Sequence, residues 1–519
     1  MRAALLAGAC GAGLAGCAVT PPDPSLPPAA TALPENYAGS AAPGDYEAAR
    51  WWESYEDPAL DALVERALAA NLDIAEAVAR IEEVEARYDR ERAALFPQVN
   101  AGIEANYADQ PATGLGAALG DAARGGGDGA PPGGGGDGSG DGSGGGSGGG
   151  DPGAAPPDGG TQRFSFSTYT ARLEASWEAD IWGRLANRAR AADADLSATR
   201  AELQAVRIRI ASAVMREYFD LVETGQLRAI SARQADILGE RVELAERAFL
   251  RGIGSSFELI SLNESRREAE AAVPRLDAAL TQAKARLAVL LATYPGEVEA
   301  ALAEAGRLAV TLPMEAVPAG LPARLLERRP DIAAARARLD AARFGVAAAE
   351  AARLPQLTFS ASGGLEGNEP AGAFDPQNWF VNLLGALTAP IVDAGRIGAQ
   401  IDISEARMRR RAAAYGRTVI NAVAEVESAL ARHAAAAERV RLIAADLDSA
   451  REAADLQLRR FERGTGTYSD WLDARLNVLN SRRLMVEAER AVADARLGVH
   501  RALGGAWKRE WLAHGGGDG

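Results

Sequence analysis

The tetrapeptide RGIG at Arg251–Gly254 returns 212 residues later as RGTG at Arg463–Gly466. In each copy a Gly-x-Gly turn stands between two long runs rich in Ala, Arg and Glu. The first run of each pair follows the dipeptide Gly-Arg, found at 183–184 and again at 395–396 with the same offset. The chain is therefore expected to hold two long helical hairpins built on one plan, at about 184–292 and 395–503.

A second set of repeats lies before the hairpins and is offset by 258 residues. Asp73-Ile74 returns as Asp331-Ile332, and Pro97-Gln98 returns as Pro355-Gln356. The two offsets differ by 46 residues, so the first half carries an insertion. It falls at about 111–160, a stretch rich in Gly, Asp, Ser and Pro. A duplication of this kind favours a symmetric assembly over a single catalytic pocket.

The insertion is expected to stay disordered, because Gly/Asp tracts bury no apolar surface. A calcium-binding β-roll is the functional alternative, but the large apolar residue that such repeats need is missing here. The hairpin helices are expected to reach on the order of 100 Å at 1.5 Å per residue. Their apolar residues step by three and four, as at Val440, Ile443, Leu447, Ala450 and Ala454. That spacing fits a coiled-coil seam and equally a plain amphipathic core face.

Four segments alternate apolar and polar residues with the period of a β-strand: about 97–109, 163–180, 356–367 and 378–392. A helix is expected before the first of them, from Asp57 to Ala94. Four strands cannot close into a barrel, and open edges in lipid leave backbone groups unpaired. Three chains together would supply twelve strands. We therefore expect a mainly helical protein with a twelve-stranded transmembrane β-barrel shared by a homotrimer.

The N-terminus reads as an export signal. Arg2 gives a positive start, Ala3–Ala15 is apolar, and the sequence LAGC ends at Cys17. An apolar run of this length is too short for a stable transmembrane helix. LAGC resembles a bacterial lipobox, which implies diacylation of Cys17 and anchoring in outer membrane lipid. An ordinary signal peptide cut nearby is the alternative.

Composition excludes several classes of function. The net charge of −15 argues against a nucleic-acid-binding surface. Three histidines, His433, His500 and His514, form no metal-like cluster, and neither a P-loop nor a Gly-x-Ser-x-Gly elbow is present. We therefore expect no enzyme activity, no cofactor and no metal site.

Four motifs in order resemble the TolC-like outer membrane efflux proteins, and within them the NodT-type lipoprotein branch. They are ADIWGR at Ala179–Arg184, LLERRPDI at Leu325–Ile332, LDAR at Leu472–Arg475 and RALGG at Arg501–Gly505. The resemblance implies a trimeric exit duct with a long periplasmic α-barrel. Such a duct takes small molecules or drugs from an inner-membrane pump through a periplasmic adaptor, or membrane fusion, protein.

The resemblance also implies that the hairpin tips close the duct and meet the adaptor. The candidate gate residues are Asp470, Trp471, Leu472 and Asp473. The alternative is that Asp470 caps a helix and that Asp473 pairs with Arg475 or with a neighbouring helix. The candidate tip turns that contact the adaptor carry glycines at Gly252, Gly254, Gly464 and Gly466.

Two other functions stay open at this point. The same fold could serve protein secretion or metal-ion export, and a coiled-coil spacer lipoprotein would need no barrel at all. The sequence divides into a signal peptide 1–16, a lipidated tether 17–56, a first repeat 57–320, a second repeat 321–507 and a tail 508–519.

Overall fold

The computed structural model describes residues 18–37, 50–111, 163–305 and 315–505. The chain divides into two compact units, of which the sheet unit takes Leu95–Ala179 and Pro355–Thr388. The helical unit takes the rest, and each unit draws on both copies of the repeat. The predictions for Cys17, the Gly-rich insertion and the C-terminal tail fall outside the described residues.

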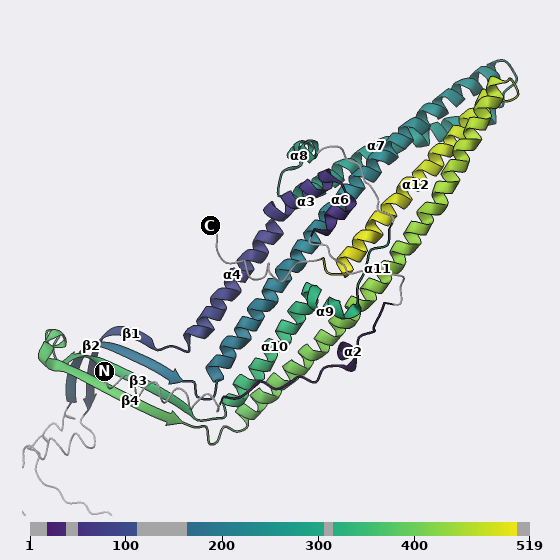
Figure 1. The fold of residues 1–519 in the computed structure, drawn as a ribbon. Helices are drawn as coiled ribbons and strands as arrows, with labels where there is room; N and C mark the ends of the chain where they lie inside the picture. Colours follow the sequence, from purple (N-terminus) through teal and green to yellow (C-terminus); the bar gives the residue numbers. More distant parts are fainter. Residues whose placement is uncertain (1–17, 38–49, 112–162, 306–314, 506–519) are drawn as a thin grey trace, which may run out of the picture. The chain divides into compact units, whose positions relative to one another are not determined.

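Two long hairpins dominate the helical unit (Figure 1). The first joins α6 Arg184–Leu250 to α7 Ser256–Leu290, and the second joins α11 Arg396–Glu462 to α12 Tyr468–Ala502. Every bound of the second hairpin lies 212 residues after that of the first. The first helix of each has 67 residues, hence a length of about 100 Å. No helix within the described ranges combines the length and the apolarity that a membrane span requires.

Shorter helices extend the hairpins into one layer. These are α4 Leu72–Ala93 and α10 Pro330–Ala351. Helix α4 packs on α6, α10 packs on both α6 and α11, and α12 also contacts α6. Figure 1 shows these helices lying side by side. The two copies of the repeat therefore pack against each other within a single wall of helices.

The helix expected at 57–94 is two helices. Helix α3 Pro58–Ala70 ends at Asn71, and α4 starts immediately after it. The Asn71 side chain accepts hydrogen bonds from the backbone N–H groups of Asp73 at 2.9 Å and Ile74 at 3.4 Å, while its amide donates to Leu290 O at 2.8 Å. Asn71 thus caps α4 and breaks the continuous helical pattern.

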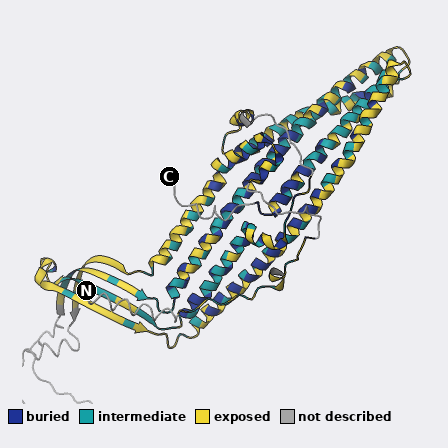
Figure 2. Cartoon of the chain, in the orientation of Figure 1, coloured by how far each residue is buried: buried dark blue, intermediate teal, exposed yellow. Residues whose placement is uncertain are grey.

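The main core lies where a short segment before α3 meets the hairpins. In the 3-10 turn η1 Trp51–Tyr55, the hydroxyl of Tyr55 donates to Ala493 O at 3.2 Å. The Trp51 ring stacks on His500 with centroids 5.3 Å apart. Figure 2 shows the buried residues gathered along the inner sides of the helices. The remaining short elements are α2 Pro28–Thr31, η2 Pro295–Glu297, α8 Val298–Ala305, η3 Pro322–Arg324 and α9 Leu325–Arg328.

Residues 18–37 form an N-terminal strap that crosses the helical wall. The backbone N–H of Val19 donates to Trp182 O at 3.0 Å. Further along, Arg343 donates to Pro22 O at 2.9 Å and pairs with Asp23 at 2.7 Å. The strap is thus tied to α10 by side-chain contacts, where the sequence indicated only a Pro-rich tether.

The sheet unit is one antiparallel sheet with strand order β1-β2-β3-β4. Its strands are β1 Gln98–Pro111, β2 Arg163–Ala179, β3 Gln356–Gly367 and β4 Trp379–Thr388. The turns η4 Gly372–Phe374 and η5 Pro376–Asn378 join the last two strands. Strands β1 and β4 are the edges, and each has a free row of backbone groups within the described chain.

Candidate functional site

The first hairpin tip turns through two glycines that are needed for different reasons. Gly252 has a φ of +75°, which an L side chain adopts only with strain. A Cβ on Gly254 would lie 2.7 Å from the backbone nitrogen of Phe249. The N–H groups of Ile253 and Gly254 donate to Ala248 O at 3.0 and 3.1 Å, which satisfies the helix end. Gly464 and its neighbours repeat this turn with a φ of +72°.

Asp470 closes the start of α12. Its backbone N–H donates to Thr467 Oγ1 at 3.1 Å, and its carboxylate accepts from Thr467 N at 3.1 Å. These reciprocal bonds form a capping box. The hydrogen bonds from Thr467 hold the pKa of the Asp470 carboxyl below its ordinary value. The carboxylate therefore stays ionised, exposed and held at the tip.

The other candidate gate residues are engaged with their own chain. Asp473 forms an ion pair with Arg241 of α6. The Trp471 ring lies under the Arg475 guanidinium, 4.8 Å from its carbon to the ring centroid. Leu472 is 0% exposed. Tyr468 adds a further link to α6 by donating to Glu240 at 2.8 Å. The second tip is thereby fastened to the first hairpin.

The first tip differs from the second by an exposed apolar surface, here called the first tip patch. It consists of Phe249, Leu250, Ile253, Phe257 and Ile260, which are 45–80% exposed. At the second tip the turn residue that corresponds to Ile253 is Thr465. Exposed apolar clusters of this kind mark contact surfaces for partners.

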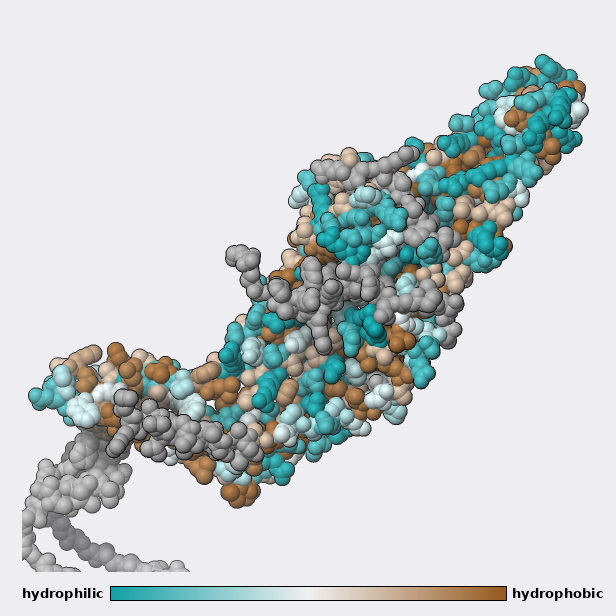
Figure 3. Space-filling model, in the orientation of Figure 1, coloured by the Kyte–Doolittle hydropathy of each residue, from teal (hydrophilic) through white to brown (hydrophobic). Residues whose placement is uncertain are grey.

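The sheet presents two chemically different faces. Its register pairs odd-numbered residues with odd-numbered ones across all four strands, so they share one face. That face exposes Val99, Ile103, Tyr107, Leu173, Trp177, Phe359, Leu383 and Leu387. Figure 3 shows apolar residues gathered on this unit. The even-numbered face carries Glu104 and Arg172, paired at 3.5 Å, and is polar apart from residues such as Phe380 and Leu384 on β4.

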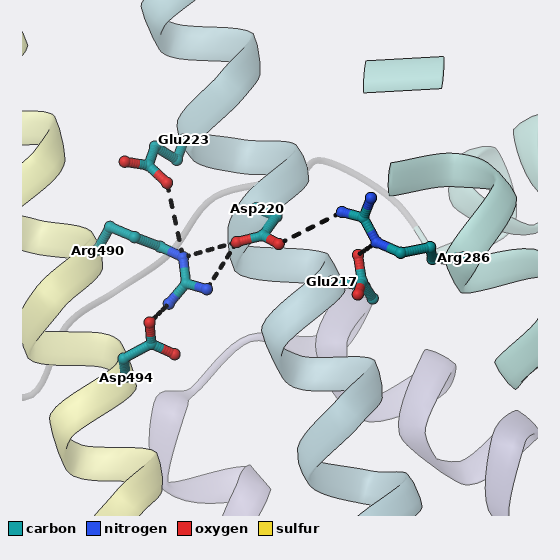
Figure 4. A network of polar contacts seen from close by, with 6 residues as sticks. All are labelled: Glu217, Asp220, Glu223, Arg286, Arg490 and Asp494. Carbon is teal, nitrogen blue, oxygen red and sulfur yellow. Dashed lines mark hydrogen bonds and ion pairs between the residues drawn. The ribbon is translucent and has the colours of Figure 1, made fainter. Parts of the chain in front are cut away.

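An ionic network fastens α12 and α7 to the middle of α6 (Figure 4). Arg490 of α12 donates to Asp220 at 2.7 Å and also pairs with Glu223 and Asp494. From the other side, Arg286 of α7 donates to Glu217 at 2.8 Å and reaches Asp220 at 3.6 Å. Because Asp220 is shared, the network joins three helices at one point.

The family model described as outer membrane efflux protein matches residues 63–293 and 321–505. The chain belongs to this family. The family's members are channel components of efflux systems in the outer membrane and are not enzymes. The resemblance and the fold class predicted from the sequence, with long helical hairpins and four strands, are thereby confirmed.

Individual relatives agree with the family assignment. The chain is 28% identical over 461 residues to the pyoverdine export outer membrane protein OpmQ of Pseudomonas aeruginosa, covering 89% of this chain and 88% of that protein. It is 26% identical over 502 residues to the cation efflux system protein CusC of Escherichia coli, covering 96% and 97%. The crystal structure of the Campylobacter jejuni CmeC outer membrane channel matches with a TM-score of 0.76 at 18% identity, covering 96% and 97%.

The sequence predicted the positions of the tip turns of this efflux protein but not the contacts around them. The first tip patch was visible as apolar residues on both sides of the RGIG turn, where a solvated tip would carry polar ones. Glu240 and Arg241, the partners of Tyr468 and Asp473, lie more than 200 residues away in the sequence. No local sequence pattern could therefore predict these contacts. Within the described residues, no group of three or more His, Cys, Asp or Glu is arranged to hold a metal ion.

Proposed function

We propose that this outer membrane efflux protein is the exit duct of a tripartite system. In it, the duct receives small molecules from an inner-membrane pump through a periplasmic adaptor and releases them outside. The observation that carries the proposal is the pairing of one amphipathic four-stranded sheet with two hairpins of about 100 Å on the same chain. The sheet supplies a wall with an apolar and a polar face, and the hairpins supply the length that a duct through the periplasm needs.

The duct is a homotrimer in this proposal. Neighbouring strands alternate in direction, so β1 and β4 run oppositely and β4 of one copy pairs antiparallel with β1 of the next. Three copies then close a barrel of twelve strands in which no backbone edge is left unpaired. The apolar odd-numbered face meets lipid, and the polar face lines the lumen. Native mass measured in detergent tests the assembly, and a conducting monomer would contradict it.

Acylation of Cys17 completes the membrane anchor. The support is the LAGC sequence, a lipobox-like string before the strap. The barrel also holds the protein in the membrane, so the lipid acts as a second attachment. Replacing Cys17 with Ser is expected to block processing at this position. Unaltered processing and unaltered mass of the mature N-terminal peptide would contradict the proposal.

The adaptor docks on the hairpin tips. The first tip patch gives it apolar area, and the glycine turns let its backbone approach closely. Changing Phe257 to Ser is expected to weaken adaptor binding about tenfold, because a large exposed apolar anchor is lost. Phe374 in the sheet unit is similarly exposed at 65% and serves as the matched control when changed to Ser.

The resting gate lies at the same tips. Asp470 supplies fixed negative charge, and the Asp473–Arg241 pair and Tyr468–Glu240 bond hold α12 against α6. Of the two apolar candidate gate residues, Trp471 is partly exposed, whereas Leu472 is fully buried and packs inside the helical wall. Opening then requires the second hairpin to separate from α6.

Export of metal ions is the second candidate, because a relative named for cation efflux covers nearly the whole chain. The first proposal, export of small organic molecules, is favoured by the relative named for pyoverdine export. A deletion strain tested against matched panels of drugs and metal salts separates these two. Sensitivity to organic compounds alone supports the first proposal, and sensitivity to metals alone supports the second. No change in either panel would contradict the efflux function under those conditions.

A further inference from the structure

Three hollows on the helical wall join into one groove. Ala205 lines all of them, and Arg209, Asp331 and Glu425 each line two. The groove runs along α6 between α4 on one side and α10, α11 and the end of α12 on the other. Nine arginines and six carboxylates line it, in a chain whose net charge is −15. The groove is therefore a basic surface within an acidic protein.

In the hollow between α6, α10, α11 and the end of α12, the carboxylates that line the surface already form ion pairs. Asp331 and Glu425 both pair with Arg329, at 2.7 and 2.8 Å. Asp494 pairs with Arg490, which belongs to the ionic network of Figure 4. Three arginines remain, Arg216, Arg432 and Arg501, and none of them forms an ion pair with a carboxylate of the described ranges. Burial and the nearby Arg216 lower the pKa of Arg501, and the opposing effect of Glu425 does not cancel them.

Where it crosses α10 and α11, the N-terminal strap lies on the face opposite the groove. Pro27 of the strap lies against Gly416. A Cβ added to Gly416 would be 2.9 Å from the Cγ of Pro27. Gly416 follows the groove residue Arg411 by five positions, which is about 140° around an α-helix. Arg343, which holds Pro22 and Asp23, likewise follows the groove residue Arg338 by five. Strap and groove are thus separated by one layer of helices.

The position of the strap indicates which face of the helical wall is inside the duct, and this inference rests on the proposed function. A strap that leads to a lipid anchor must remain outside a closed barrel, because the acyl chains enter the membrane around it. The strap face is then the outer face of the helical wall, and the groove faces the lumen.

We propose that the groove around Arg216, Arg432 and Arg501 is an anion-binding site inside the duct, which takes small molecules that carry carboxylate or phosphate groups. Guanidinium groups bind such groups through paired, charge-assisted hydrogen bonds. Three copies of the groove form a positively charged belt around the axis of the trimer. A cleft with an excess of one sign of charge raises the local concentration of the opposite ion.

The test compares two triple variants of the full-length protein that lose the same charge. The groove variant carries R216Q, R432Q and R501Q. The control carries R336Q, R409Q and R441Q, three exposed arginines that share the strap face by helical spacing. Citrate binding is measured by calorimetry in detergent, and the ratio of anion to cation permeability is measured in planar bilayers across a KCl gradient. Native mass records the trimer for each protein.

The groove variant is expected to lose citrate binding about tenfold and to lower the permeability ratio about twofold, with the trimer intact. The control variant is expected to match the parent in both. Equal citrate binding in parent and groove variant would overturn the proposal. Loss of the trimer in the groove variant alone would overturn it too, and would assign the arginines to a contact between copies. A parent that binds citrate in the groove but never conducts would refute the duct function and leave the binding site standing.

Discussion

At the scale of single residues, the tip turns depend on backbone conformation more than on side-chain contacts. Gly252 has a positive φ and open space around the position of a Cβ, so only its conformation resists substitution. Gly252→Ala is expected to destabilise the turn by about 1 kcal/mol. Gly239→Ala within α6, where space is also open, is the control and should stabilise by about the same amount. Protease nicking at the tip is the measurement, and equal nicking of the two variants would contradict the prediction.

Asp61 makes stability depend on pH. Burial, with Glu53, Asp57 and Glu65 nearby, raises the pKa of its carboxyl from 3.8 to about 6. Its Oδ1 atom is buried and lacks a hydrogen-bond partner among the described residues. Because the folded pKa is the higher one, protonation favours the fold: the contribution is complete below pH 3.8 and is lost as the pH rises through about 6.

Asp61→Asn, which mimics the protonated carboxyl, is therefore expected to raise the thermal unfolding midpoint at neutral pH. The gain should vanish at pH values below 3.8, where the native carboxyl is itself protonated. Asp89→Asn on the exposed side of α4 is the control and should match the parent at every pH. A gain that is the same at all pH values would show that charge is not its cause.

At the scale of elements, the sequence predicted the features that depend on local residue patterns. The long helices, the strands and the glycine turns follow from periodicity and from residues with special φ angles. The bounds of the hairpin helices repeat with the offset of 212 seen in the sequence, and those of α4 and α10 with the offset of 258. The break at Asn71 was missed because helical apolar spacing continues on both sides of it, although an Asn that caps the following helix is a local signal. The partners of the candidate gate depend on how α12 packs on α6, which no local pattern contains.

Helix α12 is held to α6 near the tip by Asp473, and this predicts the behaviour of the gate. Asp473→Asn removes the charge that pairs with Arg241 and is expected to raise single-channel conductance, because the hairpin separates more easily from α6. Asp470→Asn changes a carboxylate of the same tip that only caps its own helix, so it should raise conductance much less. Conductance that rises equally in both variants would favour a simple charge effect over release of the helix.

At the scale of the whole molecule, duplication has produced two copies with one geometry and different chemistry. The hairpins share their lengths, yet the first tip exposes the five apolar residues of the first tip patch, whereas the second exposes Phe461 beside polar and ion-paired residues. In a trimer, six hairpins would alternate between these two kinds around the axis. A partner with threefold symmetry can then bind the apolar tips without contacting the second tips, which Asp473 and Tyr468 hold against α6.

The assembly itself rests on the two open edges of the sheet, and they allow a direct test. Asn106 on β1 and Asn382 on β4 both lie on the even-numbered face, which lines the lumen in the proposed barrel. If β4 of one copy pairs with β1 of the next, a bifunctional thiol cross-linker should join Asn106→Cys and Asn382→Cys when both are present in one chain. The products should end at trimers, since a closed ring has no fourth neighbour. Each single variant should stay uncrosslinked, because its thiols are a whole sheet apart. A ladder beyond trimers would indicate open-ended pairing of edges, and single-chain products alone would show that the edges do not meet between copies.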